Sequence, residues 1–266
     1  MTTGTTGPAA ATTPAGRMAA LGRAELTLLR RNRTALATAL LLPAAMIAAW
    51  RPLTSKLDLG GSGLDAATLS MSGGVGFILL FVVYYNVVTA YVARREDLVL
   101  KRLRAGEPTD AEILAGTALP SVAVALAQCA ALAVSGAVLL RTGPPHRPDL
   151  LVLGLVLGVA LLVAQAAVST VFTETVELAQ LTTAPLLVVS AVGSGFLVPL
   201  DLLPDPLTAV CRLLPFTPVM ELVQAGWQGG DRATATHVLA SAALAMAWTA
   251  ATVFAVRRWF RWEPRR

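Results

Sequence analysis

Long uncharged runs of apolar residues recur six times along the chain. They cover residues 34–50, 66–93, 113–140, 150–173, 178–200 and 233–256. Because a bilayer core about 30 Å thick takes about 20 helical residues, all but the first run exceed the length of a membrane span. A soluble helix buries one stripe and carries charge on the opposite face, whereas these runs have no charged face. The pattern predicts an all-α polytopic membrane protein with six transmembrane helices.

Composition fits the same class, because 55% of the residues are hydrophobic and only 14% are charged. Six spans with short joins account for nearly the whole chain, so we expect one integral membrane domain over residues 17–258. A cytoplasmic tail follows at 259–266. Residues 1–16 are rich in Thr, Ala, Gly and Pro and lack the basic start and apolar core of a signal peptide. We expect them to form a disordered tail.

The basic residues are distributed unevenly between the two sides of the predicted spans. Fifteen of the 21 Lys and Arg residues precede the first span, follow the last, or lie between spans two and three. The other six fall in the loops on the opposite side. Under the positive-inside rule, both termini are cytoplasmic and the protein belongs in the cell membrane. The net charge of +5 therefore reflects topology and gives no reason to expect a nucleic-acid partner.

Leucines alternate with arginines over residues 17–33. This pattern predicts an amphipathic helix lying in the inner headgroup layer. A plain basic segment beside the membrane is the alternative.

The loop over residues 94–108 combines charges of both signs with an apolar edge at helical spacing. Gly106 and Pro108 are expected to end a short helix, and Thr109 with Glu112 predicts a capping box for the next one. A simple stop-transfer cluster, which needs only basic residues, is the alternative. We favour a docking surface with Leu100 and Leu103 as buried anchors and charges at its rim. The candidate docking residues are Arg94, Arg95, Glu96, Leu100, Arg102, Leu103 and Arg104.

The last outer loop, residues 199–232, is long and apolar and contains five prolines. Its leucine-rich pieces are too short to span a bilayer, so they predict interfacial or re-entrant helices. Glu221 and Arg212 are candidates for an ion pair there, although such residues often face water.

Several kinds of catalytic site are missing from the sequence. Neither of the two lysines follows a glycine-rich phosphate loop, so the chain lacks that means of binding ATP. Two histidines cannot build a three-histidine zinc site. Glu174 and Glu177 would need further polar ligands inside the spans to form an intramembrane protease. We therefore expect no catalytic residue, metal or cofactor in this chain.

Taken together, three features resemble the ABC-2 family of ATP-binding-cassette permeases. They are the basic segment 17–33, the run R-R-E-x-x-x-x-K-R-L-R-A-G from Arg94, and the Pro-rich stretch from Gly195-Phe196-Leu197-Val198-Pro199 to Pro215. The resemblance runs from about Arg17 to Arg258. Richness in Ala, Arg and Leu is similar to that of actinobacterial drug and antibiotic exporters.

The resemblance implies a coupling helix at 94–108 and two short outer helices at 199–230. It also implies a homodimer, or a heterodimer with a related permease, joined to two separately encoded ATPase subunits that bind ATP and Mg. Whether the acidic join Thr173–Leu178 touches the ATPase stays open. A membrane anchor or assembly factor without transport activity is the alternative function, and an ATPase gene next door would distinguish the two.

The spans offer a transported molecule only uncharged polar groups. Ions, phosphates or sugar acids would be expected to need intramembrane charges, so the cargo predicted is an apolar or amphipathic small molecule entering from the membrane lipid. The alternative is that many of these groups only hold helices together. The candidate path residues are Tyr84, Tyr85, Asn86, Thr89, Gln128, Gln180 and Ser190.

Overall fold

The computed structural model describes Gly16 and residues 66–106, 108–139, 143–197, 199–260 and 262–263. Within these ranges every regular element is helical. The predicted tail other than Gly16, the interfacial helix at 17–33 and the first span at 34–50 lie outside the described residues.

Five described segments are long and apolar enough to cross a membrane, which confirms a polytopic α-helical membrane protein. They correspond to the second to sixth uncharged runs of the sequence. Their bounds are Leu69–Glu96, Asp110–Gly136, Pro148–Ser169, Val176–Gly193 and Ala235–Trp259.

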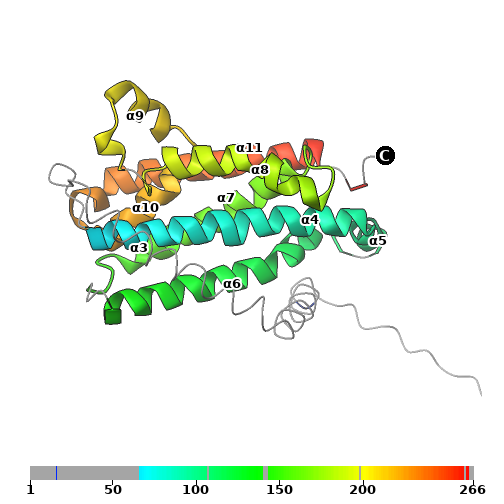
Figure 1. Ribbon diagram of the computed structural model, residues 1–266, viewed down its shortest axis with the longest axis horizontal. Coiled ribbons are helices and arrows are strands. Elements are labelled where there is room, and N and C mark those ends of the chain that lie inside the picture. Colours follow the sequence, from blue (N-terminus) through cyan, green and yellow to red (C-terminus); the bar gives the residue numbers. More distant parts are fainter. Residues whose placement is uncertain are drawn as a thin grey trace, which may run out of the picture.

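The first of these spans is built from three consecutive helical pieces that cross the whole length of the molecule (Figure 1). They are α3 (Ala66–Phe77), the π-helical segment η1 (Ile78–Tyr85) and α4 (Asn86–Glu96). A π-helix has i→i+5 hydrogen bonds, is rare over such a length and is frequently found at functional sites. A π-helix has more residues per turn than an α-helix. The spacing between residues that share one face of the span therefore changes in η1.

Helix α7 (Pro148–Ser169) occupies the middle of the bundle. It packs against η1 and α4, and against α6 (Asp110–Leu139), α10 (Thr217–Gln228) and α11 (Ala235–Trp259). Glycines on α7 allow close approach: a Cβ on Gly158 would lie 2.8 Å from Val219 Cγ1, and one on Gly154 would lie 3.0 Å from Val223 Cγ2. Small residues at such crossings let helix backbones approach in a membrane, where there is no hydrophobic drive between helices.

The predicted re-entrant structure follows α8 (Val176–Gly193). Its elements are η2 (Leu200–Leu202), α9 (Asp205–Arg212), α10 and η3 (Gly230–Ala233). Helices α9 and α10 are bent by 96° relative to each other, and α9 projects away from the bundle (Figure 1). Helix α10 is almost entirely buried beside α7, α3 and α11. The predicted short helices in this loop are confirmed, and by length and composition the bent pair α9–α10 is either a broken span or a re-entrant loop.

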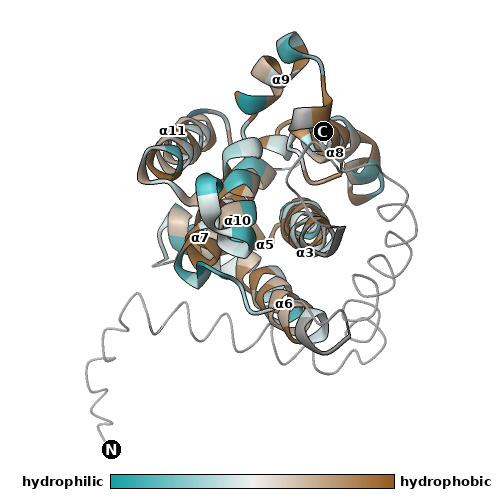
Figure 2. Ribbon diagram, turned by 90° about the vertical axis from the view of Figure 1, so that its left-hand side faces the viewer, coloured by the Kyte–Doolittle hydropathy of each residue, from teal (hydrophilic) through white to brown (hydrophobic). Residues whose placement is uncertain are grey.

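Figure 2 views the bundle from the end at which α9 projects and shows α8 and α11 on its periphery. These two helices expose large apolar side chains, including Leu181 at 73% and Leu239 at 69%. Apolar side chains on the outside of a membrane bundle are suited to contact with lipid or with other membrane helices. The two ends of the bundle are called the α9 end and the α5 end, after the helices found there.

Candidate functional site

The short helix at the α5 end of the bundle, α5 (Val99–Arg104), begins later than the sequence predicted. Helix α4 continues through Arg94 and Arg95 to Glu96, and Leu98 then adopts φ 59°, ψ 15°, in the left-handed region. Two hydrogen bonds close this turn, from Asp97 N to Ala93 O and from Leu98 N to Arg95 O. A left-handed leucine costs about 1–2 kcal/mol, and strained residues of this kind cluster at functional sites.

The predicted helix caps on the far side of α5 are confirmed. Gly106 N donates to Leu103 O just after α5 ends. Thr109 N donates to Glu112 Oε2 over 2.7 Å, and Glu112 N donates to Thr109 Oγ1 over 3.4 Å. Arg104 forms an ion pair with Asp110 over 3.1 Å, so α5 is also tied to the first turn of α6.

Arg95 lies inside the protein, not at the rim of the α5 surface where the sequence placed it. Its side chain is 2% exposed and points into the turn between α7 and α8. Nη1 donates to the Thr170 carbonyl over 2.8 Å, and Nη2 donates to the carbonyls of Thr173 and Glu174. Helix C-termini leave carbonyls without intrahelical donors, and a buried guanidinium is well suited to them. Arg95 therefore connects the base of α5 with the turn between α7 and α8. This turn includes the start of the acidic segment Thr173–Leu178, whose contact with the ATPase the sequence left open.

The other predicted docking residues divide into two groups. Leu100 is fully buried within the chain and cannot serve as an anchor for a partner protein. Leu103 is half-buried and does reach the surface, and Leu98, the residue before α5, is exposed. Arg94 is half-buried, and the exposed charged residues of this segment are Glu96, Asp97, Lys101, Arg102 and Arg104.

The segment that follows the last span folds back onto α5, which the sequence reasoning did not predict. Lys101 Nζ lies 2.9 Å from Glu263 Oε1, and the Arg104 guanidinium lies 4.8 Å from the centre of the Trp262 ring. Phe260 packs edge-on against both Tyr91 and Trp262. The cluster of aromatic residues at 259–262 was the one signal available in the sequence.

The candidate path residues do not gather in one place. Tyr84 is fully buried and its hydroxyl lies 2.9 Å from Ser169 Oγ on α7, and Ser190 on α8 is also buried. Tyr85, Asn86 and Thr89 instead lie on the partly exposed side of the α3–η1–α4 span. Gln180 is exposed on α8.

Gln128 on α6 is 3% exposed, and neither atom of its side-chain amide has a hydrogen-bond partner in the part of the chain that the structure describes. A buried polar group left in this way costs about 1–3 kcal/mol, and such a group calls for an explanation. It therefore stays a candidate for contact with a transported molecule.

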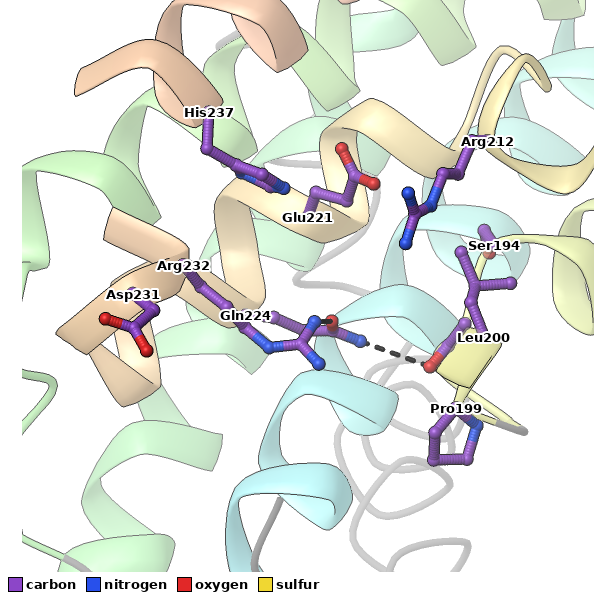
Figure 3. Close-up of a pocket in the computed structure, with 10 residues that line it drawn as sticks. Ser194, Pro199, Leu200, Arg212, Glu221, Gln224, Asp231, Arg232 and His237 are labelled. Atoms are coloured by element: carbon purple, nitrogen blue, oxygen red, sulfur yellow. Dashed lines mark hydrogen bonds between the residues drawn. The ribbon is translucent and has the colours of Figure 1, made fainter. Parts of the chain in front are cut away.

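A second polar region lies at the α9 end, where a cavity of about 230 Å³ is lined by residues of α9, α10, η3 and α11. Arg212 and Glu221 both line it and face it from different helices (Figure 3), but no ion pair between them is present. Glu221 accepts a hydrogen bond from Ser241 over 2.7 Å. Gln224 accepts from Arg232 and donates to Gly195 O over 3.1 Å. This network fixes α10 against the α8–η2 join.

Comparison with curated proteins finds no match. The ABC-2 type transporter family matches residues 17–226. The match includes the short helix α5 and its caps, the central helix α7 and nearly all of the re-entrant pair α9–α10. Because it covers well over half of the chain, the chain belongs to the ABC-2 type transporter family.

Proposed function

We propose that this chain is the permease subunit of an ATP-driven exporter that moves hydrophobic or amphipathic molecules of the drug and antibiotic class out of the cell. ABC-2 permeases normally work with ATPase subunits. The chain carries no glycine-rich phosphate loop, so the ATP and Mg would be bound by a separate partner. The proposed assembly contains two such ATPases and a second permease, either identical or related.

One observation carries the cargo class: the exposed face of the α3–η1–α4 span is aromatic and uncharged. Phe77 and Phe81 stack with ring centroids 4.2 Å apart, and Tyr85, Asn86 and Thr89 continue the same partly exposed side. Aromatic rings offer apolar area, and the amide and hydroxyl groups offer hydrogen bonds without the cost of a buried charge. A face of this kind suits an amphipathic molecule arriving from the surrounding lipid.

The α5 end supports attachment to an ATPase. Residues 96–104 present exposed Leu98 and half-buried Leu103 among charges of both signs. Arg95 fixes the start of this segment, and the capping box of α6 follows its end. Apolar anchors surrounded by a polar rim are the usual composition of a specific protein interface. By the distribution of basic residues, this end faces the cytoplasm.

The cargo class is tested by the drug tolerance of cells. Cells expressing this permease with its ABC ATPase are expected to tolerate several amphipathic antibiotics better than cells whose ATPase lacks its phosphate-binding lysine. Growth inhibition curves and accumulation of a fluorescent drug measure the difference. Unchanged tolerance, together with export of a polysaccharide or an ion that depends on the pair, would contradict this cargo class.

The coupling surface is tested by Leu103→Asp, which places a charge at the remaining apolar anchor of α5. Buried interface anchors can contribute more than about 2 kcal/mol, whereas exposed rim charges contribute little. We expect Leu103→Asp to uncouple ATP hydrolysis from transport and Arg102→Ala to retain most of both activities. Drug-stimulated ATPase activity and drug uptake into inverted vesicles are measured at equal amounts of inserted permease. Full activity of the Leu103→Asp protein would refute the assignment.

A further inference from the structure

A cavity of about 420 Å³ opens between α6, α7 and α11 at the α5 end of the bundle. Its volume falls in the range of about 300–1,000 Å³ that is usual for ligand sites. Its walls consist of small or apolar side chains, among them Ala115 on α6, Ala164 on α7 and Val256 on α11. The alanines of α6 and α7 that line the cavity have short side chains, so they leave this apolar space unfilled.

The mouth of this cavity is polar and aromatic. Arg104, Asp110 and Arg257 line it, together with Phe260 and Trp262 of the segment that folds back onto α5. Arg104 and Asp110 are paired with each other. Arg257 is exposed, and no hydrogen bond or ion pair joins it to another described residue. The mouth therefore has one available guanidinium beside two aromatic rings.

We propose that this cavity binds an anionic phospholipid, with an acyl chain between α6 and α11 and the phosphate at Arg257. A guanidinium donates in a fork that matches a phosphate group. Basic pockets between transmembrane helices on the cytoplasmic side are suited to anionic head groups, and Trp residues are enriched at the depth of the head groups. The positive-inside distribution places the α5 end in that leaflet.

A cargo molecule is a less suitable occupant. The face proposed for cargo lies along the exposed side of the α3–η1–α4 span and carries no charge, whereas only Tyr91 of that span lines this cavity. The lipid site is independent of the proposed transport activity, because it requires only the bundle and a membrane with anionic lipid.

The site is tested with a phosphatidylglycerol that carries a photoactivatable diazirine in its acyl chain, using the full-length protein in phosphatidylcholine vesicles. After illumination, cross-links mapped by mass spectrometry are expected in peptides containing Ala115 or Ala164. Unlabelled phosphatidylglycerol should compete, and phosphatidylcholine should not. Arg257→Gln is expected to lower the labelling about fivefold, and Arg257→Lys should retain most of it. Arg258→Gln is the matched control, because its side chain is exposed but does not line the cavity.

Three results would overturn the proposal. Equal labelling by phosphatidylglycerol and phosphatidylcholine probes, unaffected by Arg257→Gln, would show a void that any acyl chain fills. Displacement by an amphipathic drug but not by phosphatidylglycerol would assign the cavity to cargo. A lack of labelling in the unaltered protein would show that protein covers it. If Arg257→Gln does not fold, Ala115→Phe fills the cavity from α6 with Arg257 intact, and it should abolish labelling of the α7 peptide.

Discussion

Replacing Arg95 by leucine is expected to destabilise the folded protein by about 3 kcal/mol, because hydrogen bonds to a charged group contribute about 1.5–3 kcal/mol each. The Arg95 guanidinium donates to carbonyls of Thr170, Thr173 and Glu174 at the end of α7. Leucine cannot replace these donors, and Thr170 and Thr173 are too buried for water to do so. Thermal unfolding of the purified protein in detergent measures the loss.

Two further substitutions make the Arg95 experiment specific. Arg102→Leu removes the same charge from an exposed position on α5 and should change the unfolding temperature little. Arg95→Lys keeps the charge but not the planar fork that reaches several carbonyls, so an intermediate loss is expected. Equal unfolding temperatures for Arg95→Leu and Arg102→Leu would contradict the assigned role.

Replacing Gly226 by alanine is expected to separate α10 from α7 and to cost about 1–3 kcal/mol or more. A Cβ at this position would lie 2.7 Å from the backbone nitrogen of Leu151 and 3.0 Å from its Cα. Backbone atoms cannot rotate away as a side chain does, so the two helices must move apart. The hydrogen bond from Arg147 N to Gly226 O, 3.0 Å long, would be strained by that movement.

Gly143→Ala is the matched control for Gly226→Ala, because a Cβ on Gly143 meets nothing within 4 Å. Unfolding temperature and the rate of proteolysis near η3 compare the two proteins. If Gly226→Ala and Gly143→Ala behave alike, the close contact between α7 and α10 does not hold the re-entrant pair in place. Loss of transport in Gly226→Ala alone would further connect this contact with export.

Both experiments concern the ends of the central helix α7. At one end Arg95 fixes it to α4 and the base of α5, and at the other end Gly226 brings it against α10. Helix α10 and helix α4, which leads into α5, thus contact the same central helix.

The sequence by itself determined the features that depend on local chemistry. Spans two to six follow from uncharged length, because the cost of placing charge in lipid is a property of each segment alone. The capping box of Thr109 and Glu112 and the end of α5 near Gly106 also depend only on neighbouring residues. Five prolines between leucine-rich pieces were enough to predict re-entrant helices in the last loop.

Only the tertiary structure decided which side of a helix each residue faces. Arg95 was expected at a rim, but its partners lie more than 70 residues away, at the end of α7. Tyr84 turns inward to Ser169 of α7, whereas its neighbour Tyr85 lies at the partly exposed side of the span. The contact of Glu263 with Lys101 likewise depends on where α11 ends relative to α5. These contacts arise from the packing of distant segments, which no local pattern encodes.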